Sequence, residues 1–145
     1  MLFRSVTVGA PAYFRRHGEP NRPEDLKAHN CILYTGLATQ NEWPYMRDGR
    51  SCPVRVSGSF QSNSAEAVRA AALAGMGIAL SPVWLFGEDI RARRVSVVLA
   101  DYSAKPLPIH ALSPANRRYS AKVKAFVDFF KAEFDLDPFV SAYRA

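Results

Sequence analysis

A polar run, Ser62-Asn63-Ser64, comes directly before an alanine-rich segment and offers the clearest chemistry in the chain. Asparagine is a preferred residue just before the first helical turn, and Glu66, three residues after Asn63, completes the capping-box spacing. A helix start also presents unpaired backbone N–H groups, which attract anions and other oxygen-bearing groups. We therefore expect Asn63 to cap a helix, and Asn63 and Ser64, with Ser62 as a further candidate, to contact a small ligand.

Histidine and cysteine residues form no metal-binding pattern. His17, His29 and His110 are far apart in the sequence, and none has a carboxylate or thiol beside it at ligand spacing. His29 and Cys31 could in principle act as a base and a nucleophile, but alternate residues of a strand point to opposite faces. We therefore expect no metal, no cofactor and no catalysis. A small hydrolase that uses Cys31 or a serine with His29 is an alternative.

The bulk composition is that of an ordinary folded domain. The 145 residues carry a formal charge of +6, yet the basic residues are scattered and no DNA-recognition helix is visible, so we do not expect this chain to bind nucleic acid directly. The two cysteines form no CxxC pair, and no secretion signal is visible at the start. This favours a cytoplasmic protein with free thiols. The apolar stretches are too short to span a membrane.

Strand-like and helix-like patterns alternate along the chain. The sequence predicts a helix from Asn63 that ends at Gly75, and an amphipathic helix from about Ser120 whose apolar stripe includes Phe126 and Phe130. Asp48-Gly49 predicts a tight turn. Strands are expected at Leu2–Val8, Cys31–Thr35, PVRVSGSFQS (53–62), IALSP (78–82), RVSVVLADY (94–102) and PLPIHALSP (106–114).

This alternation predicts an α/β sandwich. In open sheets of this kind, ligands bind beyond the carboxyl ends of the strands, where helix N-termini point. Ser62, Asn63 and Ser64 follow one such strand. Pro11 and Tyr13 follow the first strand and Thr35 and Gly36 follow the CILY strand, so both pairs are candidates for one wall of a ligand cleft.

Three stretches, in this order and spacing, carry a family resemblance: GAPAYFRRHGEPNRPEDLKAHNCILY, VSGSFQSNSAEAVRAAALAGMGIALSP and PLPIHALSPANRRYSAKVKAFVDFFKAEF. Together they resemble the effector-binding half of a LysR-type transcriptional regulator, over nearly the whole chain. In one place the sequence departs from the family pattern. The family usually has a glycine and a leucine before the strand that here reads ARRVSVVL, whereas this chain has Ala92 to Val95, so the local turn geometry is in question.

The resemblance implies a lobe like that of a type II periplasmic binding protein, a Rossmann-like α/β sandwich, plus part of a second lobe. Strands at Leu2–Val8 and Pro108–Leu112 would cross between the lobes. Residues 9–106 would form mainly one lobe, and 107–145 the returning strand and C-terminal helix of the other. The whole chain, 1–145, would be a partial effector-binding domain that lacks the family's N-terminal helix-turn-helix, its linker helix and the first half of the other lobe.

The function implied is that of a sensing domain without catalysis. A small anionic or polar effector would bind at Asn63 and Ser64, in the cleft between the lobes, and would control DNA binding by a helix-turn-helix domain outside this chain. The resemblance also implies a homo-oligomer and no membrane partner. A solute-binding receptor of the same architecture, without a role on DNA, is the alternative.

Overall fold

A five-stranded mixed sheet forms the centre of the molecule. The computed structural model describes residues 2–37, 39, 41–104, 107–112 and 120–136. The strands lie in the order β10 (Ser96–Val98), β2 (Ser5–Gly9), β9 (Ile78–Pro82), β3 (Cys31–Tyr34) and β8 (Phe60–Ser62). β3 pairs in parallel with both β8 and β9, whereas β2 runs antiparallel to β9 and β10. The predicted α/β fold is confirmed.

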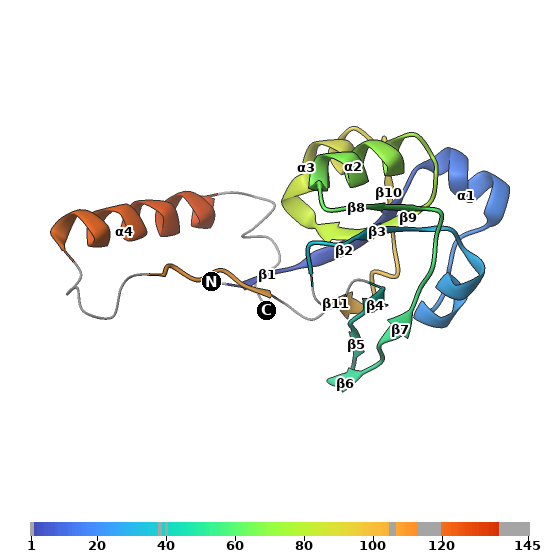
Figure 1. Cartoon of the computed structure of the whole chain (residues 1–145), viewed down its shortest axis with the longest axis horizontal. Coiled ribbons are helices and arrows are strands. Elements are labelled where there is room, and N and C mark those ends of the chain that lie inside the picture. The colour runs from blue at the N-terminus through green and yellow to red at the C-terminus, as the bar shows by residue number, and fades with distance from the viewer. Residues whose placement is uncertain (1, 38, 40, 105–106, 113–119, 137–145) are drawn as a thin grey trace.

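Helices α2 (Ala65–Leu73) and α3 (Val83–Arg91) cover one face of this sheet (Figure 1). Strand side chains alternate between faces, so Ile32 and Ala79 pack under these helices while their neighbours Cys31 and Ile78 face the other way. The core beneath the helices is completed by Val6, Val8, Val68, Ala71, Ala72, Val83, Phe86 and Val95. The small alanines of α2 bring the helix close to the sheet.

Helix α1 (Pro11–His17) and the 3-10 helix η1 (Pro23–Ala28) contribute to the core on the opposite face. Short strands complete this face: β4 (Glu42–Trp43) pairs with β7 (Val54–Arg55), and β5 (Tyr45–Arg47) pairs with β6 (Arg50–Ser51) and with β11 (Ser103–Ala104). These strands carry Trp43, Tyr45 and Val54 into the core. The buried hydroxyls of Thr7 and Tyr45 share a hydrogen bond of 2.6 Å, which fixes β5 against strand β2 of the five-stranded sheet.

The Asp48-Gly49 turn between β5 and β6 has the conformation that the sequence predicts. Both residues have positive φ angles, 49° and 73°. A two-residue hairpin of this kind needs left-handed backbone at both central positions, which aspartate tolerates and glycine favours. The turn fixes the register of the hairpin, in which Arg47 lies opposite Arg50.

The chain enters and leaves the sandwich through a pair of antiparallel strands. β1 (Leu2–Phe3) pairs with β12 (Leu107–Pro108). The regular strand is shorter than the predicted Pro108–Leu112 segment, because residues 109–112 have no strand pairing and Leu112 is almost fully exposed. Beyond them, α4 (Ala121–Leu136) lies apart from the sandwich (Figure 1), and none of its described side chains is buried.

Two local predictions require correction. The N-cap of α2 is Ser64 and not Asn63: Ser64 has extended backbone, and its Oγ accepts a hydrogen bond from the N–H of Ala67. Ser64 therefore takes the capping role by starting the helix one residue later. The sequence analysis also missed α3, because Pro82 looks like the end of a strand and also occupies the N-cap position of this helix.

The end of α3 answers the question about the turn at residues 92–95. Arg93 has a φ of 56°, and the N–H of Arg94 bonds to the carbonyl of Asp89. The same pattern ends α2, where Gly75 has a φ of 72° and the N–H of Met76 bonds to Ala71. Both helices thus end in a left-handed residue with a six-to-one hydrogen bond. An arginine occupies at α3 the position that glycine occupies at α2.

Candidate functional site

The N-terminus of α2 opens at one edge of the central sheet, directly after β8. Ser62, the last residue of β8, accepts a hydrogen bond from the N–H of Ser64 on its Oγ. Ser64 in turn caps the helix, while the side chain of Asn63 is exposed. The cap satisfies one N–H of the first turn, and the helix itself offers no acceptor to the N–H groups of Ala65 and Glu66. This helix end can therefore donate hydrogen bonds to an oxygen-bearing group.

Thr35 and Gly36 lie beside this helix start. The N–H of Thr35 donates to the carbonyl of Ser62 at 2.9 Å, extending the parallel pairing of β3 and β8 beyond the ends of the strands. Gly36 is exposed, and the tip of the Tyr34 side chain lies over it. The structure thus brings together five of the seven predicted site residues: Thr35, Gly36, Ser62, Asn63 and Ser64.

The other two lie at the opposite edge of the sheet. Gly9, at the end of β2, pairs with Ile78 at the start of β9, and Ile78 also pairs with Cys31 at the start of β3. Because β2 runs against these strands, Pro11 and Tyr13 follow it at their amino ends. The expectation that these two residues share a cleft wall with Thr35 and Gly36 is therefore wrong. The sequence could not reveal this, because strand direction is not encoded locally.

Tyr13 instead packs in the core on the face of the sheet that α1 and η1 cover. Its side chain is 2% exposed, and its hydroxyl accepts from the N–H of Asn30 at 2.9 Å and bonds to Nδ1 of His29 at 3.2 Å. The hydroxyl accepts from Asn30, and the direction of its bond to His29 follows the tautomer of that ring. Burial, followed by the nearby His17, lowers the pKa of His29.

The environment of Cys31 does not suit a nucleophile. Its side chain is fully buried, its sulfur bonds to the carbonyl of Leu26, and burial raises the pKa of the thiol to about 12. A reactive thiol needs the opposite shift, because the thiolate is the attacking species. His29 is bonded through Nδ1 to Tyr13. The alternative of a thiol hydrolase that uses Cys31 and His29 has no support in this geometry.

β1, which pairs with β12, joins the sandwich at the same edge as the helix start. Ser5, at the beginning of β2, pairs with Pro82 at the end of β9, so β1 joins the sheet at the carboxyl ends of the parallel strands. A hollow of about 90 Å³ lies here, lined by residues of the β1–β2 junction, β2, β10 and the segment after β10: Arg4, Ser5, Val6, Thr7, Val97, Val98, Leu99, Ala100 and Tyr102. An edge that carries both a helix N-terminus and the β1–β12 pair suits a ligand site.

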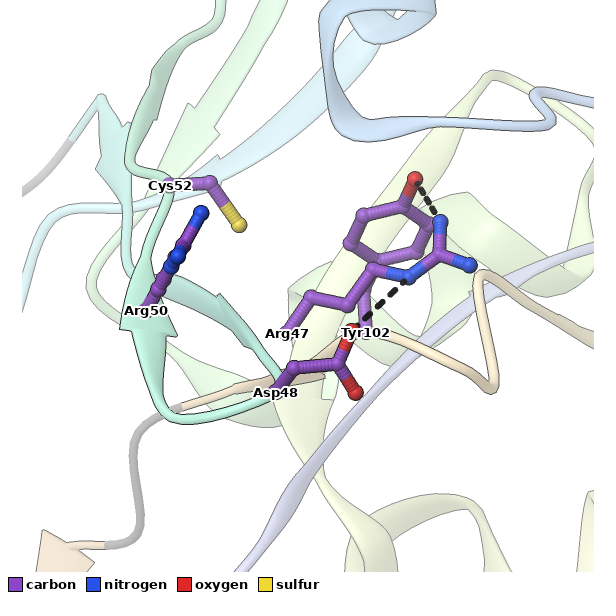
Figure 2. A pocket seen from close by; sticks show the side chains of 5 residues that line it. All are labelled: Arg47, Asp48, Arg50, Cys52 and Tyr102. Atoms are coloured by element: carbon purple, nitrogen blue, oxygen red, sulfur yellow. Dashed lines mark hydrogen bonds and ion pairs between the residues drawn. The ribbon is translucent and has the colours of Figure 1, made fainter.

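A larger hollow, of about 540 Å³, lies on the β5–β6 hairpin and not at the helix start. Figure 2 shows its lining residues: Arg47, Asp48, Arg50, Cys52 and Tyr102. The sequence analysis did not select any of them, although the Arg-Asp-Gly-Arg run around the predicted turn was a usable signal. Among the described residues, no group of three or more histidine, cysteine or carboxylate side chains could hold a metal ion, and no helix is long and apolar enough to cross a membrane.

The fold and this edge define a class of protein: an α/β sandwich that the β1–β12 pair joins beside a helix N-terminus. The model of the LysR substrate binding domain family matches residues 2–135. The chain therefore belongs to this family, and it is the effector-binding domain of a LysR-type regulator. The predicted family is confirmed.

Individual curated regulators are similar to the chain in sequence. The chain is 28% identical over 131 residues to the HTH-type transcriptional regulator CrgA of Neisseria meningitidis serogroup C, covering 90% of this chain and 44% of the relative. It is 27% identical over 137 residues to the HTH-type regulator PtxR of Pseudomonas aeruginosa, covering 94% and 44%. The chain thus spans less than half the length of these curated relatives.

Solved structures show the same fold. The regulatory domain of AphB from Vibrio vulnificus, treated with cumene hydroperoxide, superposes with a TM-score of 0.74 at 29% identity, covering 90% of this chain and 65% of that one. The CrgA regulatory domain from Neisseria meningitidis gives a TM-score of 0.71.

Proposed function

We propose that the effector of this domain is a small anionic or polar metabolite, held at the carboxyl edge of the sheet by the start of α2. Support comes from one observation above all: Ser62, Ser64 and Thr35 meet there through hydrogen bonds, beside the strands that cross to the other lobe. An oxygen of the effector would accept from the free N–H groups of the first helical turn, with Asn63 and Gly36 lining the same site. The partial positive charge of a helix N-terminus favours such a group.

Ligand binding would act through the relative population of lobe arrangements. An effector that touches both lobes binds one arrangement more tightly than the other, and it shifts the population by that difference in affinity. In the whole protein this change would reposition DNA-binding domains outside the present chain and would do so in a homo-oligomer in the cytoplasm. The HTH-type names of the relatives support this proposal. Residues 9–106 would form one lobe, and 107–145 would belong to the other.

The test uses a panel of small carboxylates and phosphates and isothermal titration calorimetry on the intact regulator. The intact regulator with the original sequence is compared with its Ser64→Gly and Asn63→Ala variants. Ser64→Gly keeps the backbone cap conformation accessible but removes the hydroxyl, and we expect each variant to weaken binding about fivefold or more, since hydrogen bonds to charged groups contribute roughly 1.5–3 kcal/mol.

Glu66 supplies a second, independent change at the same site. Its carboxylate lies in the first turn of α2, is 76% exposed, and reaches Arg69 at 3.9 Å. Removing its charge in Glu66→Gln should strengthen the binding of an anion and leave a neutral ligand unaffected. Unchanged affinity in Asn63→Ala, Ser64→Gly and Glu66→Gln together would exclude this edge as the effector site.

A further inference from the structure

The β5–β6 hairpin places two positive charges directly opposite each other. In its register Arg47 pairs with Arg50 across the Asp48-Gly49 turn, so both side chains project from the same face. Residues in this relation have Cβ atoms roughly 5 Å apart, and like charges at such positions destabilise a hairpin. The fold therefore places two positive charges on one hairpin, with the guanidinium group of Arg47 beside Tyr102 and that of Arg50 on the side of Cys52 (Figure 2).

Only one carboxylate among the described lining residues offsets this charge. Asp48 reaches Nε of Arg47 at 3.8 Å but is 91% exposed, so its contribution is weak. Within the described part of the chain, no carboxylate lies within ion-pair distance of Arg50. Asp101 also acts electrostatically on Arg47, so the positive charge without an ion-pair partner lies mainly on Arg50.

Tyr102 adds a hydrogen-bond donor to the two guanidinium groups. Nη1 of Arg47 donates to the Tyr102 hydroxyl at 2.8 Å, and the guanidinium carbon lies 5.0 Å from the centre of the ring (Figure 2). An arginine can only donate, so the hydroxyl accepts from it and keeps its own hydrogen for another partner. The tyrosine also holds Arg47 in one orientation, which lowers the entropy that binding would cost.

We propose that Arg47, Arg50 and Tyr102 form a binding site for a small oxyanion, a carboxylate or a phosphate, separate from the cleft at α2. They line a hollow of about 540 Å³ that is wide open to solvent, so a ligand there would be held mainly by charge and hydrogen bonds. Planar guanidinium groups match the geometry of both oxyanions. The site is built on one hairpin and one neighbouring segment, so it is complete in this chain.

The position of Tyr102 connects this site to the crossing strands. Tyr102 directly precedes β11, which pairs with β5 and leads toward β12. Its side chain also lines the smaller hollow that contains Arg4 and Ser5, at the junction of β1 and β2. An anion bound between the hairpin and Tyr102 would therefore hold the hairpin against the segment that precedes β11. Such an anion acts as a second regulatory ligand.

Nuclear magnetic resonance titration of the 15N-labelled full chain tests the site, with inorganic phosphate and citrate as separate probes. Binding should shift the backbone amides of residues 47–52 and 102 and the Nε–Hε signals of the two arginines. Arg50→Gln should weaken binding about tenfold or more, and Tyr102→Phe roughly three- to tenfold. The matched control is Arg15→Gln, an exposed arginine on α1, which lies away from the hairpin in Figure 1. It should leave the affinity unchanged.

If citrate binds with the higher affinity, the site is assigned to carboxylates. If phosphate binds with the higher affinity, the site is assigned to phosphate groups. The melting temperature gives a readout without ligand: Arg50→Gln removes the like-charge pair, so its melting temperature should not fall. Phosphate and citrate that both fail to shift residues 47–52 at millimolar concentration would overturn the proposal. Equal weakening by Arg50→Gln and Arg15→Gln would also overturn it, because that result indicates only general charge attraction. Neither result bears on the site at α2.

Discussion

Arg69 of α2 makes two hydrogen bonds to the carboxylate of Asp89 on α3, from Nε to Oδ2 at 2.6 Å and from Nη2 to Oδ1 at 3.0 Å. Arg94, in the turn after α3, adds a third from its Nε to Oδ1 at 2.8 Å. Asp89 is fully buried, so its charge is retained only because two guanidinium groups surround it. This contact joins the two helices that cover one face of the sheet.

Replacing Asp89 by asparagine should destabilise the sandwich. The amide cannot accept from both guanidinium groups as the carboxylate does, and the loss of charged hydrogen bonds costs roughly 1.5–3 kcal/mol. The free energy of unfolding from urea titration measures the change. Glu19→Gln, at an exposed position, is the control and should leave the unfolding free energy within about 0.5 kcal/mol of the original. Equal stability of both variants would contradict the assigned role of Asp89.

The same contact predicts loss of stability in acid. Burial opposes ionisation of Asp89, but the hydrogen bonds from Arg69 and Arg94 prevail and hold its pKa below the ordinary value. The contribution is therefore complete above the pKa of the unfolded state, about 3.9, and is lost as the pH falls toward the lower pKa of the folded state. Unfolding free energies measured from pH 5 to pH 2 should fall more steeply for the original chain than for Asp89→Asn.

Arg93→Gly should stabilise the protein. Left-handed backbone costs a non-glycine residue roughly 1–2 kcal/mol, and the greater entropy of glycine in the unfolded chain offsets part of that gain. We expect a net increase of roughly 0.5–1 kcal/mol in the free energy of unfolding. The reverse change at the matching position of α2, Gly75→Ala, should lower stability, because it places a Cβ at a φ of 72°. A decrease in stability for Arg93→Gly would show that its side chain, and not its backbone, decides the effect.

Ser64 and Asn63 should differ sharply in their effects on stability. Ser64→Ala removes the acceptor for the N–H of Ala67 and should cost about 1 kcal/mol. Asn63→Ala should change the unfolding free energy by only a few tenths of a kcal/mol, because the exposed side chain does not cap α2. Thermal unfolding followed by circular dichroism makes the comparison. The opposite order would restore the original prediction that Asn63 is the cap.

His29 should make stability depend on pH near neutrality. Its pKa in the folded chain is lowered, first by burial and then by His17, so protonation favours the unfolded state. Stability should be complete above the unfolded pKa of about 6.5, and should decrease as the pH falls from there toward the folded pKa. His29→Gln should flatten this dependence between pH 7.5 and pH 5. A profile of unchanged slope in the variant would assign the effect to another group.

The isolated chain should associate through α4. Phe126 and Phe130 are 63% and 42% exposed, and the centroids of their rings are 4.6 Å apart. An exposed apolar stripe of this kind favours contact with another surface. Analytical ultracentrifugation should show self-association that the double variant Phe126→Asp, Phe130→Asp reduces. Lys122→Gln on the same helix, outside the stripe, is the control; an equal effect of the two would argue against the apolar stripe.

The sequence alone determined the features that depend on neighbouring residues. The Asp48-Gly49 turn, the left-handed glycine at the end of α2 and the apolar stripe of α4 were predicted correctly, because each rests on local conformational preference or periodicity. The ordered motifs were also sufficient to predict the family. Capping was predicted to within one residue, since Asn63 and Ser64 are both good caps and local rules do not choose between them.

Only the tertiary structure decided which residues meet. Strand direction placed Tyr13 at the far edge of the sheet and Thr35 beside Ser62, although each directly follows a strand in the sequence. Asp89 and Arg69 are twenty residues apart, and their contact required α2 and α3 to pack on the same face. The opposed arginines of the hairpin gained significance from the position of Tyr102, fifty-five residues after Arg47. Such contacts arise from chain topology, which no local pattern specifies.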